Sequence, residues 1–446
     1  MHFLPHTDAD RSEMFAALGI EDWDGLFQDI PAALRIKGKL NLPGPMWEGE
    51  LKAHLVSLAE MNQTIEQYTS FLGGGTYRHA IPSVVPALLQ RSEFYTAYTP
   101  YQPEISQGTL QAIFEFQTMI CQLTGLDAAN ASMYDGATAL AEAVIMSLQV
   151  NRAKRILVSG ALHPEYRQVL DTYLQGLGVK VEEVPLFDGR TQPEKLQEML
   201  DDDVAAVVVQ NPNFFGTVES GGEIGKIVKN SKALLIVAVT DPSSLALLSA
   251  PGDYGADIVV GEGQAFGNPL NFGGPLLGFF AVGNKFIRRM PGRIVGQTED
   301  ESGKRGFVLT LQAREQHIRR EKASSNICTN EASCALAATI YLSYMGKHGM
   351  AGLARLLYQR AHYFQTKITQ INGVEAAFNS PYYREFVVKV PDLEDVLDRL
   401  AHQGVLAGIN LEKFHSPLKD HLLVCVDELT TPEQLDQAIS RWEGLA

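Results

Sequence analysis

Cysteine, long apolar runs and positive charge are all scarce in this sequence of 446 residues. The four cysteines (Cys121, Cys328, Cys334 and Cys425) are scattered and form no CxxC pair, which argues against a disulfide framework and a zinc site. No run approaches the roughly 18 apolar residues that span a bilayer. The net charge of −15 argues against nucleic acid or an anionic membrane as the main partner.

The N-terminal segment shows neither a targeting signal nor a compact pattern. Its first ten residues, MHFLPHTDAD, lack a basic region followed by an apolar stretch, and they are too acidic for a transit peptide. We therefore expect the chain to act in the cytosol. Residues 1–61 contain short helical patterns broken at Pro43, Gly44 and Pro45, and we interpret them as an N-terminal arm that packs on a partner chain.

Short apolar runs alternate with helical patterns in the middle of the chain. The clearest runs are Arg155–Ser159, Val204–Val209, Leu234–Val239 and Asp257–Gly261. Continuous apolar runs of this length, bounded by turn residues, indicate strands buried on both faces of a parallel sheet. After about residue 328 the pattern changes to long Ala/Leu-rich helices and a small α+β set. The sequence thus predicts an α/β protein with a large domain over 62–328 and a smaller C-terminal α/β domain over 329–446.

Three positions in the predicted large domain carry polar groups where α/β proteins bind ligands. Gly136 and Thr138 begin a helix, where free N–H groups and a hydroxyl can hold a phosphate. His163 and Asp241 each follow a predicted strand, at the edge of the sheet where ligands bind. Taken singly, Gly136 with Thr138 is better explained as a helix cap and His163 as a polar loop histidine, whereas for Asp241 a turn-forming Asp-Pro is an equally good explanation.

The order and spacing of these residues resemble those of aspartate-aminotransferase-like (fold type I) pyridoxal-phosphate enzymes. In that family a small or hydroxyl-bearing turn holds the phosphate, and a His or aromatic residue stacks on the ring. An Asp pairs with the pyridine nitrogen, and a Lys some twenty residues later forms the Schiff base. The resemblance gives these first three roles to Gly136 with Thr138, to His163 and to Asp241.

The lysine of that pattern is missing. Its position falls on Gln264, and no lysine occurs between Lys232 and Lys285. A carboxamide cannot form an imine, so no covalent cofactor site is expected in this chain. Thr138, His163 and Asp241 would then line a vestigial pocket in which only the lysine is missing. We expect side chains to fill it because protein interiors close-pack; the alternative is a pocket that retains an anionic ligand.

A polar, Tyr-rich segment is the most specific feature of the sequence. Residues 95–108 read YTAYTPYQPEISQG, and they follow FLGGGTYRH at 71–79. Tyr and Gln supply directional hydrogen bonds on stiff side chains, which suits a loop that lines a site. A packing loop is the equally good alternative from the residues alone.

The Tyr-rich segment resembles the YTPYQPEISQG signature of glycine decarboxylase, the P-protein of the glycine cleavage system. Further matches are NAS at 130–132, QNPNFFG at 210–216, GRIVG at 292–296 and REKASSNICT at 320–329. Two departures are Ser324, where Thr is common, and the variable pair Tyr134-Asp135. That family comes as one chain of about double this length or as two chains. A chain of 446 residues without the lysine resembles the N-terminal-half subunit of the two-chain form.

The resemblance implies an enzyme that is active only as a complex. The activity would be glycine dehydrogenase (aminomethyl-transferring), EC 1.4.4.2: glycine loses CO2 and its aminomethyl group passes to the lipoyl group of H-protein. The second subunit would carry the lysine and pyridoxal phosphate, in a two-plus-two assembly. Expected partners are therefore the second subunit, H-protein and glycine, with no metal, nucleic acid or membrane.

We predict that the Tyr-rich segment reaches the active site of the partner subunit. The residues in question are Tyr95, Tyr98, Tyr101, Gln102 and Glu104. Tyr98 and Glu104 are the better candidates for a direct role. We expect the glycines of 73–75 to let the backbone approach that site closely.

Three other functions fit the sequence less well. A catalytically inactive scaffold or regulatory subunit of the same fold would leave the polar loop without a purpose. A self-sufficient enzyme of this fold would need a lysine after Asp241. A nucleotide-binding protein would need GxGxxG after a first strand or a GxxxxGK[ST] loop, and the sequence has neither.

Overall fold

The apolar runs of the sequence form the strands of one central sheet in a computed structural model of the chain, which describes residues 5–65, 67–414 and 418–444. The chain divides into two units, Met1–Gln63 and Thr64–Ala446.

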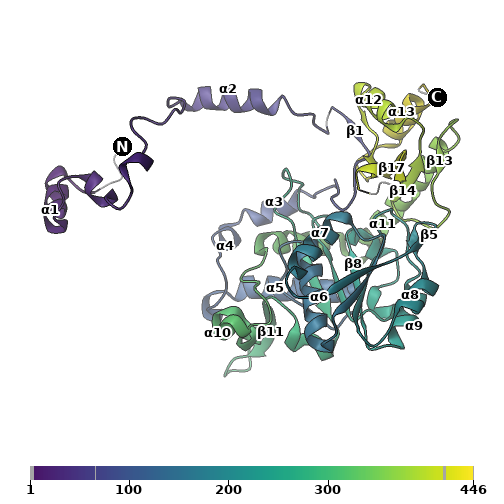
Figure 1. Ribbon diagram of the computed structural model, residues 1–446, viewed down its shortest axis with the longest axis horizontal. Helices are drawn as coiled ribbons and strands as arrows, with labels where there is room; N and C mark the ends of the chain where they lie inside the picture. Colours follow the sequence, from purple (N-terminus) through teal and green to yellow (C-terminus); the bar gives the residue numbers. More distant parts are fainter. Residues whose placement is uncertain (1–4, 66, 415–417, 445–446) are drawn as a thin grey trace. The chain divides into compact units, whose positions relative to one another are not determined.

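The first unit consists of short helices that have no core. They are α1 (Asp8–Leu18), η1 (Trp23–Phe27), η2 (Ala32–Leu34) and α2 (Glu48–Ala59), and none of them contains a buried residue (Figure 1). Trp23, Trp47 and Leu55 are among the large apolar side chains exposed here. Apolar exposure on this scale marks an interaction surface. Packing of this unit on a partner chain stays a prediction.

A seven-stranded sheet forms the centre of the second unit. In spatial order its strands are β2 (Ala128–Ala129), β10 (Gly278–Val282), β9 (Ile258–Glu262), β8 (Leu234–Val239), β7 (Val204–Gln210), β3 (Arg155–Ser159) and β4 (Lys180–Val184). The five strands from β9 to β4 are mutually parallel, whereas β10 and β2 are antiparallel to their neighbours. The predicted α/β architecture with a parallel-rich sheet is therefore confirmed.

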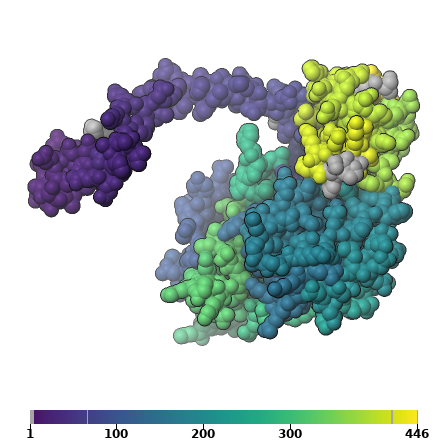
Figure 2. Space-filling model, in the orientation of Figure 1, coloured from purple at the N-terminus to yellow at the C-terminus, as the bar shows by residue number. Residues whose placement is uncertain are grey.

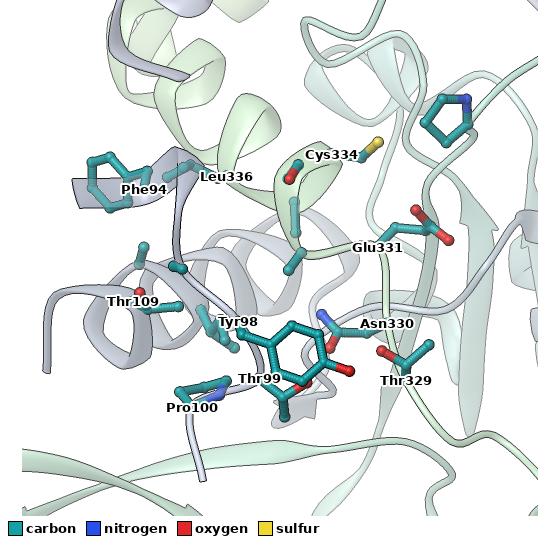
Figure 3. A pocket seen from close by; sticks show the side chains of 17 residues that line it. Phe94, Tyr98, Thr99, Pro100, Thr109, Thr329, Asn330, Glu331, Cys334 and Leu336 are labelled. Carbon is teal, nitrogen blue, oxygen red and sulfur yellow. The ribbon is translucent and has the colours of Figure 1, made fainter. Parts of the chain in front are cut away.

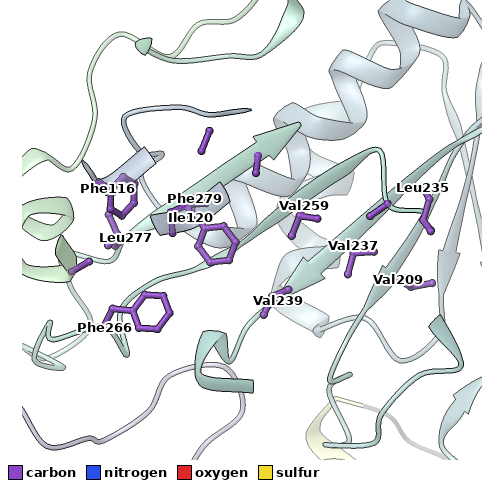
Figure 4. Packing of buried hydrophobic residues seen from close by; sticks show 14 of the residues in the cluster. Phe116, Ile120, Val209, Leu235, Val237, Val239, Val259, Phe266, Leu277 and Phe279 are labelled. Atoms are coloured by element: carbon purple, nitrogen blue, oxygen red, sulfur yellow. The ribbon is translucent and has the colours of Figure 1, made fainter. Parts of the chain in front are cut away.

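The strands are continuous apolar runs because both faces of the sheet are covered. Every residue of β7, β8, β9 and β10 is buried. Side chains alternate between the faces with period two. Leu235, Val237 and Val239 of β8 belong to one core together with Val259 (Figure 4), whereas Leu234 and Ile236 belong to the core on the other face.

Helices from separate parts of the sequence provide these two covers. Residues of α5 (Gln107–Thr124) and α11 (Ala332–Ile368) lie in the first core, and residues of α6 (Gly136–Asn151) and α7 (Pro164–Leu174) lie in the second. No helix in the described ranges is long and apolar enough to cross a membrane. The shorter elements are α3 (Val84–Leu89), α4 (Ser92–Tyr95), α8 (Pro193–Met199), α9 (Gly221–Lys229), α10 (Gln316–Arg319) and the strand pairs β5 (Leu186–Phe187) with β6 (Arg190–Thr191) and β11 (Ile294–Glu299) with β12 (Arg305–Thr310).

The C-terminal part has a core of its own, and Figure 2 shows it in yellow as a separate lobe on the sheet region. Helix α11 leads into this part and is interrupted at Gly346, whose φ of 57° breaks the helix. The lobe contains a four-stranded sheet and two helices. These elements are β13 (Glu375–Ala376), β14 (Glu385–Lys389), β17 (His421–Cys425), β16 (Ile409–Asn410), α12 (Leu393–His402) and α13 (Pro432–Glu443). A parallel pair, β1 (Thr69–Ser70) with β15 (Val405–Leu406), joins residues 69–70 to this lobe.

Candidate functional site

The predicted ligand residues lie together at the edge where the parallel strands end. His163 follows β3, Gln210 ends β7 and Asp241 follows β8. The backbone N–H of His163 donates to Oε1 of Gln210 at 2.8 Å, and Nε2 of Gln210 donates to the hydroxyl of Thr240 at 3.0 Å. The sheet topology therefore brings His163 and Asp241 to one place, as the sequence predicts for the carboxyl ends of parallel strands.

Asp241 forms an ion pair within the chain. Its Oδ2 lies 2.5 Å from Nε of Arg384, and its Oδ1 accepts hydrogen bonds from the backbone N–H and the hydroxyl of Ser243. Both charged side chains are buried. The guanidinium of Arg384 also lies 3.9 Å from the centroid of the Tyr77 ring. Arg384 therefore occupies the place at Asp241 that a pyridine nitrogen takes in the resembling enzymes.

His163 is held against the segment 71–79. Its Nδ1 accepts from the backbone N–H of Glu165, so its Nε2 carries the proton and donates to the carbonyl of Gly74 at 2.6 Å. Burial lowers the pKa of His163, although the bond to Gly74 opposes this. Gly75 has a φ of 102°, and a Cβ there would lie 2.9 Å from Nε2 of His163. The backbone thus fills the space beside the imidazole.

Gln264 makes three side-chain hydrogen bonds and is only 1% exposed. Its Nε2 donates to the carbonyls of Tyr77 and Asn268, and its Oε1 accepts from the backbone N–H of Tyr77. A buried carboxamide is stable when its donors and acceptor are satisfied in this way. Gln264, which stands where the lysine is missing, therefore bonds to the same segment, 71–79, that lies against His163.

Glu385 completes the filling of the pocket. Its carboxylate accepts from the backbone N–H of Gly74 and from the hydroxyl of Tyr77, both at 2.7 Å. The space among Tyr77, Asp241, Arg384 and Glu385 cannot hold a water molecule. The close approach expected of the glycines at 73–75 is thus made within this chain, against its own pocket.

The predicted phosphate-binding turn is occupied by carboxylates of the chain itself. Gly136 N–H donates to Oε2 of Glu262 at 3.0 Å, and Oε1 of Glu262 accepts from the backbone N–H groups of Gln264 and Leu277. Asp135 caps the helix by accepting from the N–H of Thr138 at 2.8 Å. A helix N-terminus favours an anion, and here carboxyl groups of the protein take the position that a phosphate would need. The residues present do not fit pyridoxal phosphate.

Replacing Glu262 with Gln is expected to change the dependence of stability on pH. Burial raises the pKa of Glu262 to about 7, although three backbone N–H bonds favour the ionised form. The unfolded chain ionises this group above its ordinary 4.5, so the folded state loses stability as the pH rises from 4.5 to 7. The neutral amide avoids this loss. Urea unfolding should therefore show the variant gaining about 2 kcal/mol on the wild type between pH 5 and pH 8. A difference that stays constant over this range would contradict the prediction.

The Tyr-rich segment is displayed outward and lies away from the filled pocket. Tyr95, Tyr98 and Ile105 are each at least 80% exposed. Of the five side chains predicted to reach a partner, only Tyr101 hydrogen-bonds to another described residue, where it accepts from Arg293. Exposed apolar and aromatic side chains gathered in one loop are typical of an interaction surface.

A cavity of about 360 Å³ lies between this loop and the start of α11. Tyr98, Thr99 and Pro100 line it from the loop, and residues 329–336 line it from the start of the helix (Figure 3). None of the vestigial residues contributes to this lining. The residues predicted from the sequence thus form two separate places: a filled pocket and an open cavity.

Sequence reasoning missed four residues that shape these two places: Arg384, Glu385, Glu262 and Arg293. Arg384 directly precedes β14 and Glu385 begins it, ahead of three apolar residues, and this is the only local sign of an unusual role. Arg293 lies in a segment matched by the resemblance, which gave it no role. No group of three or more His, Cys, Asp or Glu side chains able to hold a metal occurs among the described residues.

Comparison with known proteins covers the whole chain. The family described as glycine cleavage system P-protein matches residues 1–442. A probable glycine dehydrogenase (decarboxylating) subunit 1 from Moorella thermoacetica is 55% identical over 446 residues, which is 100% of each chain. A crystal structure of glycine decarboxylase (P-protein), in inhibitor-bound form, matches with a TM-score of 0.89 at 42% identity over 100% of both chains.

A more distant structure supports the fold alone. A sphingosine-1-phosphate lyase of Burkholderia pseudomallei has a TM-score of 0.67 at 16% identity, covering 93% of this chain and 94% of its own. These matches confirm the predicted aspartate-aminotransferase-like fold. The Moorella relative has the same length and is described as subunit 1, which confirms the predicted resemblance to one subunit of the two-chain form. The chain belongs to the glycine cleavage system P-protein family.

Proposed function

We propose that this chain is one of two subunits of a glycine dehydrogenase (decarboxylating), and that it acts only together with a second, lysine-bearing chain. The complex would decarboxylate glycine and transfer the aminomethyl group to the lipoyl group of H-protein. One observation carries the proposal: the pocket at Asp241 and Gln264 is filled, while an exposed polar loop lies beside an open cavity. If the chain were only a catalytically inactive scaffold or regulatory subunit, that loop would have no function.

The second chain would hold the cofactor. Pyridoxal phosphate supplies an electron sink for decarboxylation, and it needs a lysine, a phosphate site and a partner for its ring nitrogen. Here Gln264 bonds to Tyr77, Glu262 occupies the helix N-terminus and Asp241 pairs with Arg384. Three independent interactions would have to be broken for the cofactor to enter this chain.

This chain would contribute to the site of its partner through residues 95–104. Loss of CO2 is fastest when the scissile bond is held in a fixed orientation and the carboxylate is shielded from water. Stiff Tyr side chains can exclude water, while Gln102 and Glu104 can form directed hydrogen bonds. Both are exposed, and their side chains make no hydrogen bond to other described residues, so they are available to a partner.

Tyr98→Phe and Glu104→Gln are expected to lower kcat/KM for glycine in the reconstituted two-chain enzyme. Tyr98→Phe removes a hydroxyl group, Glu104→Gln replaces one acceptor oxygen and the charge by an NH2 group, and each leaves the shape of the side chain nearly unchanged. Loss of one such bond corresponds to roughly a tenfold decrease. The measurement is glycine-dependent CO2 release by the wild type and the variants at several glycine concentrations.

Tyr173→Phe is the matched control, because Tyr173 is also partly exposed but lies in α7, outside the Tyr-rich segment. It should leave turnover unchanged. Unchanged turnover and unchanged glycine affinity in both Tyr98→Phe and Glu104→Gln would show that these two residues have no direct role.

Three more detailed points remain predictions. They are transfer to H-protein, a two-plus-two assembly and action in the cytosol. The family and the subunit description of the relative support a second subunit in the glycine cleavage system.

A further inference from the structure

Arg293 is a buried arginine that ties the Tyr-rich segment to the start of α11. It is only 6% exposed. Its Nη2 donates to the hydroxyl of Tyr101 at 2.9 Å and to the carbonyl of Cys328 at 2.7 Å. Its Nη1 lies 3.4 Å from the side-chain oxygens of Thr329 and Asn330. Arg293 thus bonds to the Tyr-rich segment and to residues 328–330, of which Thr329 and Asn330 line the open cavity.

The backbone around Arg293 is itself fixed. Its carbonyl accepts from the N–H of Ala131 at 2.8 Å, and the carbonyl of Gly292 accepts from Nη2 of Arg314 at 2.6 Å. Gly292 has a φ of 77°, and a Cβ there would lie 2.9 Å from Nδ2 of Asn130. Segments 130–132 and 328–330 therefore both bond to Arg293, the first to its backbone carbonyl and the second to its guanidinium. A side chain anchored in this way can set the position of a loop.

Among the described residues, the charge of Arg293 has no counter-ion. No carboxylate of the described residues lies within 4 Å of its guanidinium, and all its partners are neutral oxygens. Its Nε is buried and has no partner among the described residues. A buried arginine stays protonated, and burying such a charge without an anion is costly. The arrangement therefore favours a negative charge supplied from outside this chain.

Tyr101 connects this charge to the exterior. Its oxygen accepts from Arg293, so its own O–H must point away from the guanidinium. The side chain is half exposed, and its hydroxyl donates to no other described residue. A phenol that accepts from a cation is a stronger hydrogen-bond donor through its remaining proton. The proton of Tyr101 is thus oriented and free for an acceptor outside the chain.

We propose that Arg293 is a positioning residue that holds Tyr101 so that its phenol proton binds the carboxylate of the amino-acid substrate in the shared site. This inference rests on the proposed function. A neutral phenol holds a carboxylate less tightly than a direct guanidinium pair does. The substrate is thereby oriented, while its carboxylate is not over-stabilised before CO2 leaves.

Arg293→Lys, Tyr101→Phe and the double variant test this proposal in the reconstituted enzyme. Each single variant should lower kcat/KM for glycine roughly tenfold to a hundredfold, mainly by raising KM. The double variant should be no worse than the poorer single one, because both changes break the same interaction. Association of the two chains, measured by sedimentation, should be unchanged. Multiplicative effects of the two changes, or a loss of association with normal glycine KM, would overturn the proposal.

Hydrogen exchange of the full chain alone provides a readout that does not depend on activity. Arg293→Lys should speed amide exchange over residues 98–106, because the lysine cannot bond to Tyr101 and the Cys328 carbonyl together. Arg305→Lys, an exposed arginine in β12, is the matched control and should leave this exchange unchanged. Unaltered exchange in Arg293→Lys would exclude a positioning role. If the wild-type complex released no CO2 from glycine, the proposed function would fail, and the exchange result would still show whether Arg293 positions the loop.

Discussion

Replacing Arg384 with Met is expected to lower the free energy of unfolding by about 3–5 kcal/mol. The change leaves the carboxylate of Asp241 buried with only Ser243 as a partner. It also removes the cation above the Tyr77 ring. Removing one partner of a buried ion pair costs far more than the pair itself contributes, because the remaining charge has no compensation. Urea unfolding at neutral pH measures the loss.

Two further variants separate this effect from general disruption. Arg91→Met breaks an ion pair with Glu93 in which both side chains are exposed, and it should not change the urea midpoint. Asp241→Leu combined with Arg384→Met removes both charges, and it should lose less stability than Arg384→Met alone. A loss in Arg384→Met no larger than in Arg91→Met would show that the pair does not hold the pocket closed.

Restoring the missing lysine by Gln264→Lys is not expected to restore cofactor binding. The new ammonium would be buried in place of a carboxamide that satisfies three hydrogen bonds, at a cost of about 3 kcal/mol or more. Glu262 and Arg384 would still occupy the places of the phosphate and the ring nitrogen. Titration of the variant with pyridoxal phosphate should therefore give no specific imine absorbance.

Gln175→Lys is the matched control for this titration, because it adds one lysine at an exposed position. Any weak imine signal from surface lysines should be the same in the two variants. A stoichiometric imine in Gln264→Lys alone would contradict the account. It would also mean that the loss of cofactor binding lies at that single position, as the sequence suggested.

The sheet was predictable because its signal is local. Strands β3 and β8 have the predicted bounds, Arg155–Ser159 and Leu234–Val239; β7 is one residue longer than predicted, and β9 is shifted by one residue. A strand buried on both faces must be apolar throughout, so its length can be read from the run. The position of His163 and Asp241 at one sheet edge follows from the parallel topology.

The filling of the pocket was not predictable in detail, because its contacts join distant parts of the sequence. Gln264 bonds to Tyr77 across 187 residues, and Glu385 bonds to Tyr77 across 308. No local pattern marks such pairs. The sequence therefore showed one lost position, at Gln264, whereas the structure shows that Asp241, His163 and the helix N-terminus at Gly136 also have partners within the chain.

The Tyr-rich loop was predictable from the sequence only in part. Its polarity and stiff side chains indicated a loop that lines a site, and in the structure Tyr95 and Tyr98 are exposed. The difference among its tyrosines came only from the structure, because Tyr101 alone is bonded to Arg293, 192 residues away. Whether these residues reach a partner's active site stays a prediction.

The distribution of pyridoxal phosphate between the two chains tests most directly whether this chain has lost its own cofactor site. Equilibrium dialysis with this chain alone, the second chain alone and the complex would give the stoichiometry of each. We expect no stoichiometric cofactor on this chain alone and one pyridoxal phosphate per pair of chains in the complex. We expect glycine-dependent CO2 release only from the complex. Stoichiometric cofactor on this chain alone, or full activity of the second chain alone, would contradict these expectations.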